Sequence, residues 1–312
     1  AMIREVLPKM TAAYGAHHPE LLNARASLAG ALLRQGKFED GDPLWEEVVA
    51  PMRQMAAGEL GLPVIQMRML RAIAYINNNH TKADEIVNAL LEDMESVYGM
   101  ESGEVLGNAY YLSTLYMESG RVDRGLSFLA FWMAKGREVI DHLNPSLREL
   151  ELGLAQAYLD ADMPTEAEAI FSRVVPIIAQ LHGASEKMTV ASQLQWVRSI
   201  ARQGRGDEAV AMVSALYNRL TEELGEEDEV TRRAETTLIN TLVGLDRWND
   251  IDRIMDARME RRQDNADLLL EMAKVIINNG HAGYREHYLD VAMDAATRAA
   301  AIRGEDDPLA MA

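Results

Sequence analysis

The chain has 312 residues and no cysteine, and its 31 Lys and Arg stand against 49 Asp and Glu, which gives a formal net charge of −18. Such an excess of acid argues against general binding to nucleic acid or to an anionic membrane surface, because both need clustered cations. The lack of cysteine excludes disulfides and thiolate metal sites. It is compatible with the cytoplasm, which we expect, and also with the periplasm. No apolar run approaches the roughly 20 residues of a membrane span.

From residue 19 onward, a pattern of small and large apolar residues returns every 42 positions. The small position is held in turn by Gly41, Ala83, Gly125, Ala167 and Ala209, with Ile251 in the sixth slot. A large position keeps the same spacing at Leu28, Leu70, Leu112, Leu154, Trp196 and Leu238. Within each period, two apolar stripes at helical spacing flank a turn such as Gln35-Gly36-Lys37, which indicates a helical hairpin. A fixed period of this size is typical of a solenoid.

These positions resemble the tetratricopeptide repeat, which sets large, small and aromatic residues in its first helix, then a glycine turn, then small, aromatic and apolar residues in its second. In the first unit the places are taken by Leu28, Ala29, Leu32, Gly36, Gly41, Trp45 and Val48, and in the fourth by Leu154, Ala155, Tyr158, Ala167, Phe171 and Val174. The usual period is about 34 residues. A longer period with the connection Tyr14-Gly15-x-His17-His18-Pro19 is similar to kinesin-light-chain repeats. The resemblance implies an all-α, right-handed superhelical solenoid that binds proteins or peptides.

In chain order, we expect a lone helix at residues 3–14 and then about seven hairpins in one domain. The hairpins are predicted at about 19–58, 62–99, 103–142, 145–182, 186–224, 227–263 and 265–303, with a tail at 304–312. The last step shortens to 34 residues, from Leu238 to Met272, and Arg285 stands in the small position. The seventh hairpin is therefore either a degenerate repeat or an atypical cap, and we favour the cap. Because the chain starts inside a repeat, we expect it to be part of a longer protein.

Candidate catalytic and metal sites are weak. His17 and His18 are adjacent and have no third ligand at suitable spacing, and His281 and His287 flank a turn with the same deficiency. The sequence contains no HExxH, GxxxxGK[ST] or GxSxG motif. We therefore predict no metal site, no cofactor and no enzymatic activity.

In the architecture that the resemblance implies, the first helix of each hairpin lines a concave groove. Residues one face away from the buried stripe of these helices should therefore point into the groove. The candidate ligand-binding residues are Arg34, Arg68, Tyr75, Tyr110, Tyr111, Thr114, Gln156, Gln195, Arg198, Arg202, Arg233 and Asn240. Several are Arg in an acidic chain. Arg pairs bidentately with carboxylates and Tyr supplies rigid contact area, so we predict a protein or peptide partner with an acidic segment. The alternative is that these Arg only solubilise the surface, or pair with acids such as Glu118 and Glu149.

The resemblance does not extend to the ligand. The row of Asn that holds a peptide backbone in kinesin light chains is replaced here by Ser27, Met69, Tyr111, Gly153, Gln195 and Thr237. Two other functions stay open. One is self-association as a homo-oligomer through the aromatic-rich third hairpin or an open end, and the other is a small-molecule sensor or enzyme with a polar pocket in the groove. A binding module of this kind could serve as the regulatory or sensor arm of a larger protein.

Overall fold

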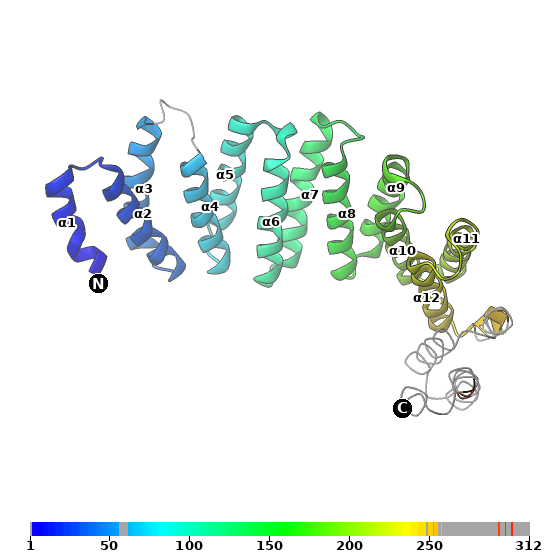
Figure 1. Cartoon of the computed structure of the whole chain (residues 1–312). Coiled ribbons are helices and arrows are strands. Elements are labelled where there is room, and N and C mark those ends of the chain that lie inside the picture. Colours follow the sequence, from blue (N-terminus) through cyan, green and yellow to red (C-terminus); the bar gives the residue numbers. More distant parts are fainter. Residues whose placement is uncertain are drawn as a thin grey trace. The chain divides into compact units, whose positions relative to one another are not determined.

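The computed structural model describes residues 2–55 and 62–247, together with scattered positions from 249 to 301. Its helices are α1 (Met2–Tyr14), α2 (Pro19–Arg34), α3 (Phe38–Met55), α4 (Leu62–Asn77), α5 (Ala83–Tyr98), α6 (Glu104–Glu118), α7 (Val122–Val139), α8 (Pro145–Asp160), α9 (Pro164–His182), α10 (Lys187–Arg202), α11 (Gly206–Leu224) and α12 (Glu229–Gly244), with a 3-10 helix at Met100–Ser102 (Figure 1). No strand occurs among these described residues, so the all-α prediction is confirmed. Most of the predicted second helix of the sixth hairpin lies outside the described residues. The same is true of almost all of the predicted seventh hairpin and tail.

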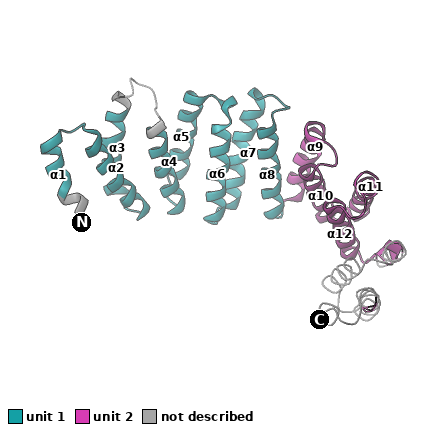
Figure 2. Cartoon of the chain, in the orientation of Figure 1, with its two compact units in different colours: residues 1–162 teal, residues 163–312 magenta. Residues whose placement is uncertain are grey.

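The chain divides into two compact units, residues 1–162 and 163–312, and the division falls between the two helices of the predicted fourth hairpin (Figure 2). In the first unit, α2 packs on α3, α4 on α5 and α6 on α7, and the first helices contact in succession, α2 with α4, α4 with α6 and α6 with α8. In the second unit, α10 packs between α9 and α11, and it also contacts α12. Neighbour-to-neighbour packing of this kind is what defines a repeat solenoid. The handedness and the total number of repeats stay predictions.

Small residues let the two helices of a hairpin approach closely. Gly41, Ala83, Gly125, Ala167 and Ala209 are all buried. A Cβ added to Gly125 would lie 2.7 Å from the backbone oxygen of Ser113, and one added to Gly41 would lie 2.8 Å from the Leu33 side chain. In the first and third hairpins, the small residue of the 42-residue pattern therefore marks the contact line between the two helices.

Polar caps and left-handed residues set the helix boundaries. The Asn144 side chain accepts a hydrogen bond from the backbone N–H of Leu147 at 3.0 Å, and Asp228 accepts one from Val230 at 2.8 Å. The turns inside the hairpins carry one residue with φ between +51° and +83°, at Gly36, Asn79, Gly120, Asp162, Gly204 and Asp246. These residue types tolerate the left-handed region, which ends the first helix.

These turn residues also reveal a slip of one residue in the second hairpin. Gly36 and Asn79 are 43 positions apart, whereas Asn79 and Gly120 are 41 apart. The predicted core residue Leu70 is accordingly 50% exposed, and Tyr75 is buried at 1% exposure in the position that Tyr116 holds in the third hairpin. A strict 42-residue count therefore misplaces every residue of α4 by one position.

At three junctions between hairpins, an acidic side chain near the start of one hairpin's second helix is bound by residues at the end of the next hairpin's first helix. Asp42, Asp84 and Glu168 share one repeat position. The Tyr75 hydroxyl donates to Asp42, and the Tyr116 hydroxyl donates to Asp84 Oδ1 at 2.7 Å. We call these contacts the acid latches. Burial first, and then the bond to Asp42, raises the pKa of Tyr75 to about 12.

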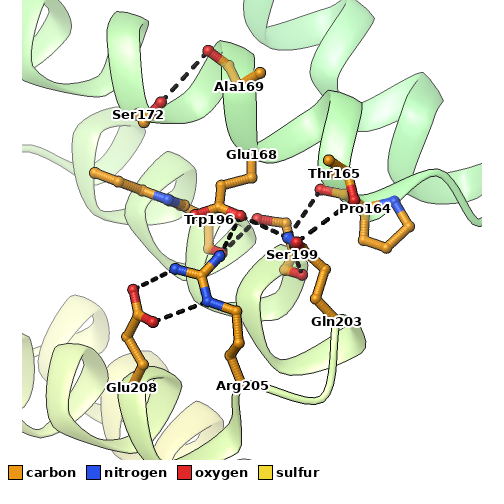
Figure 3. Close-up of polar contacts among 10 residues, drawn as sticks. All are labelled: Pro164, Thr165, Glu168, Ala169, Ser172, Trp196, Ser199, Gln203, Arg205 and Glu208. Atoms are coloured by element: carbon orange, nitrogen blue, oxygen red, sulfur yellow. Dashed lines mark hydrogen bonds and ion pairs between the residues drawn. The ribbon is translucent and has the colours of Figure 1, made fainter.

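The third acid latch lies wholly in the second unit. Gln203 Nε2 donates to Glu168 Oε2 at 2.6 Å, and Arg205 Nη1 donates to the same oxygen at 2.7 Å (Figure 3). Arg205 also forms a two-bond pair with Glu208, at 2.6 and 2.9 Å. Each latch joins one hairpin to the next through a charged acceptor, so the latches add directional contacts to the apolar packing.

Candidate functional site

An exposed stripe runs along the first helices at positions i, i+4, i+7 and i+11. In α10 these positions are Ala191, Gln195, Arg198 and Arg202, and in α12 they are Arg233, Thr237, Asn240 and Gly244. Every one of them is exposed or half-buried. Side chains at this spacing share one face of a helix, so the stripe is the surface on which a ligand could lie.

Between α10 and α12 the stripe deepens into a groove of about 640 Å³. The residues that line it are Ala191, Leu194, Gln195, Arg198, Ala201, Arg202, Glu229, Arg232, Arg233, Thr236, Thr237, Asn240, Thr241, Gly244 and Leu245. We call this the α10–α12 groove. Its volume lies in the range of about 300–1,000 Å³ that is usual for binding sites.

The α10–α12 groove is cationic in an anionic chain. Four of its lining residues are Arg and one is Glu. That one acid, Glu229, is engaged by Lys187, whose Nζ lies 2.7 Å from Glu229 Oε2. The bond and the charge of Lys187 lower the pKa of Glu229, and the bond and the charge of Glu229 raise the pKa of Lys187. The groove therefore presents an excess of positive charge to a ligand.

Hydrogen bonds inside the groove orient its donors. Arg198 Nη1 donates to Gln195 Oε1 at 3.2 Å, so the Gln195 carbonyl is used within the groove. The hydroxyls of Thr236, Thr237 and Thr241 each donate to the carbonyl four residues earlier, at 2.9, 3.0 and 2.7 Å. The threonine hydroxyl protons are therefore used within α12, and the guanidinium and amide groups are the other polar donors in the groove lining.

Five of the predicted ligand-binding residues come together in this groove, namely Gln195, Arg198, Arg202, Arg233 and Asn240. The sequence prediction omitted Arg232, Thr236 and Thr241, which line the groove beside them. Their positions were within reach of the sequence, since Thr236 and Thr241 follow Arg232 and Thr237 at a spacing of four residues along α12.

Other predicted residues lie in the first unit. Arg34 is exposed in the last turn of α2, and Tyr111 is 47% exposed on α6. The Thr114 hydroxyl donates to the Tyr110 carbonyl at 3.1 Å, and the Gln156 amide donates to Asp160 at 2.8 Å on α8. These residues are not part of the α10–α12 groove.

Two predicted residues are occupied in internal contacts. Tyr75 is buried and bonded to Asp42, and Arg68 forms an ion pair with Asp93 of α5. The slip in α4 is the reason, because it moves the exposed stripe of this helix to Gln66, Leu70, Ile73 and Asn77. Tyr75 and Arg68 therefore serve contacts inside the fold, and neither is among the ligand contacts that we propose.

A second hollow of about 620 Å³ lies between α6 and α8, and Glu104, Asn108, Tyr110 and Glu149 contribute to its wall. The Tyr110 ring packs against Gly153, where an added Cβ would come within 2.7 Å of the ring. Among the described residues, no three His, Asp or Glu are placed to hold a metal ion. None of the described helices is both long enough and apolar enough to cross a membrane.

No family model and no curated protein matches the chain. Among solved structures, it is similar to the nearly identical TPR-like repeats of a Podosopora anserina protein assigned as a kinesin light chain, with 22% identity, coverage of 66% of this chain and 97% of that one, and a TM-score of 0.42. It is similar also to a circular tandem repeat protein with novel repeat topology, with 15% identity, coverage of 95% and 75%, and a TM-score of 0.30. A third similarity is to the TPR domain of P58(IPK), with 13% identity, coverage of 98% and 94%, and a TM-score of 0.21.

Such low identities and TM-scores carry no argument about a ligand, so the assignment of the repeat rests on this chain itself. Its hairpins follow one another in sequence, their turns recur at 41 to 43 residues, and the small residues of the pattern are buried where the two helices meet. The chain is therefore an all-α helical repeat protein whose repeat positions resemble those of the tetratricopeptide repeat.

Proposed function

We propose that the chain is a non-enzymatic scaffold that binds an acidic segment of a partner protein in the α10–α12 groove. The observation that carries the proposal is the cluster of Arg198, Arg202 and Arg233 in one groove of a chain with net charge −18. Most of the surface repels an acidic segment, and this groove attracts it. The charge contrast therefore favours binding in one place and suppresses binding elsewhere.

Affinity in this groove should be moderate. Arg198 and Arg233 are exposed, and ion pairs at such positions contribute about 0.2–1 kcal/mol each. Several contacts together would give a weak and salt-sensitive complex. A partner held this way exchanges quickly, which suits a regulatory or sensor arm.

Fluorescence polarisation with the full chain tests the proposal, using a labelled octapeptide of Glu and Ser and a matched peptide of Lys and Ser. We expect the Glu peptide alone to bind, and to bind less tightly as salt is raised from 50 to 200 mM. The double variant Arg198→Gln/Arg202→Gln should weaken binding about tenfold, as the sum of two exposed ion pairs. Arg173→Gln/Lys82→Gln, at two exposed positions outside the groove, removes the same amount of charge and is the control. Equal loss of binding in both variants would show that only net charge matters and would refute the assignment to this groove.

Self-association is the second candidate function, and one observation favours it. Phe131 is 61% exposed and Val139 is 54% exposed, both on α7 in the aromatic-rich third hairpin. Large apolar side chains at an exposed surface can mark a contact between proteins. Light scattering should then show a concentration-dependent mass that Phe131→Lys abolishes, whereas a constant monomer mass would eliminate this function.

A further inference from the structure

The two walls of the α10–α12 groove run side by side in the same direction and in matching register. At one end, Lys187 and Glu229, the first residues of α10 and α12, form an ion pair. At the other end, the Leu245 side chain packs directly against Gly206, where an added Cβ would press on the Leu245 methyl groups. Residues 42 positions apart are joined at the first of these ends, and residues 39 positions apart meet at the second. Each α12 residue is therefore close to the level of the α10 residue numbered about 42 below it.

This register fixes how far apart the cations stand along the groove. Arg233 is level with Ala191, so Arg198 lies seven residues and Arg202 eleven residues further along. With a rise of about 1.5 Å per residue, these offsets are about 10 Å and about 16 Å. Arg198 and Arg202 are separated by one helical turn, about 6 Å. Arg198 and Arg202 therefore form a pair at one end of the groove, and Arg233, with its neighbour Arg232, lies at the other end.

The part of the groove between the Arg198–Arg202 pair and Arg233 is uncharged. Gln195 and Thr237 occupy it on the two walls. The Gln195 carbonyl accepts from Arg198, and the Thr237 hydroxyl donates to the Arg233 carbonyl. Neither wall carries a charged side chain at this level, so a small polar or apolar residue of a ligand fits here better than a third acid.

We propose that the groove reads the spacing of acidic residues in an extended segment, with the pattern acid-x-acid-x-x-acid or its reverse. An extended chain advances about 3.3 Å per residue. Acids two residues apart then match the separation of Arg202 and Arg198, and a third acid three residues further matches Arg233. The pattern rests on the proposed function, and it narrows the partner from any acidic segment to one with a defined interval between its charges.

Isomeric peptides test the spacing against the full chain. The first two peptides contain Glu-Ser-Glu-Ser-Ser-Glu and its reverse. A third contains three contiguous Glu, and a fourth has Glu at every sixth position of a longer Ser peptide. All four are extended with Gly and Ser to the same length. We expect one of the first two to bind about three- to fivefold more tightly than the contiguous isomer, which can reach the pair but not Arg233 as well. That factor is the contribution of one exposed ion pair.

Arg233→Gln supplies the second readout. It should lower the affinity for the spaced peptide about three- to fivefold and leave the contiguous isomer unchanged, while Arg173→Gln changes neither. If all isomers bind equally and Arg198→Gln/Arg202→Gln still weakens them all, the spacing inference is overturned and the proposed function stands. If no acidic peptide binds, both are overturned.

Discussion

Removing the Tyr116 hydroxyl is the most direct perturbation of an acid latch. Tyr116 is fully buried, and its hydroxyl donates to Asp84 Oδ1 at 2.7 Å. Tyr116→Phe keeps the ring, and with it the packing on Phe128 at 5.7 Å between centroids and the Arg121 guanidinium at 4.7 Å from the ring. Only the hydrogen bond is lost, so the substitution isolates its contribution.

The expected cost is about 1.5 kcal/mol. A hydrogen bond to a charged acceptor contributes about 1.5–3 kcal/mol. The lower end applies, because Asp84 is 45% exposed and keeps its ion pair with Arg124 at 3.0 Å. The carboxylate is therefore not left without partners when the hydroxyl is removed.

Hydrogen exchange measures this cost locally, which matters because repeat proteins can unfold in parts. A loss of about 1.4 kcal/mol speeds exchange from locally opened states about tenfold. We expect that acceleration in the backbone amides of α5 and α6 of Tyr116→Phe. Tyr111→Phe on the same helix is the control, since Tyr111 is 47% exposed and should change little. Similar exchange in the two variants would contradict the idea that the latches stabilise the repeat junctions.

Three further predictions concern pH, glycine and a buried ion pair. Because the pKa of Tyr75 is raised from 10.0 to about 12, its proton stabilises the fold fully below pH 10. That stabilisation is lost as the pH rises through about 12. Between about pH 10 and 12 the urea midpoint of the wild type should therefore fall more steeply than that of Tyr75→Phe. Parallel plots of urea midpoint against pH for the two proteins would contradict this prediction. Gly125→Ala should destabilise the protein by about 1–3 kcal/mol, because the new Cβ overlaps the backbone of α6. Gly107→Ala has nothing within 4 Å of its new Cβ and should stabilise the protein by up to about 1 kcal/mol. Thermal unfolding measures both, and a change of the same sign in the two variants would refute the packing argument. Glu151→Ala should cost about 3–5 kcal/mol, because it removes the buried carboxylate whose Oε2 lies 2.6 Å from Nη1 of the buried Arg148. A urea midpoint unchanged from wild type would disprove this.

The sequence was a sound guide to the repeat but a poor one to the exact register of α4. The small residues Gly41, Ala83 and Gly125 keep a strict 42-residue spacing, and each is buried as predicted. The turn residue Asn79 lies one position later than that spacing requires. A single shift of this kind barely changes an apolar pattern, yet it rotates a helix by about 100° and exchanges a groove position for a core position. This is why Tyr75 was predicted to face the groove and is buried instead.

The amino-acid sequence by itself determined the helical hairpins, their period and the small residues at their contact lines, because these depend on local spacing and on side-chain volume. It also marked Gln195, Arg198, Arg202, Arg233 and Asn240 as surface residues of two first helices. Only the tertiary structure decided that these five residues line a single groove. Their convergence depends on α10 and α12 packing side by side in register, and no spacing within one helix encodes that contact.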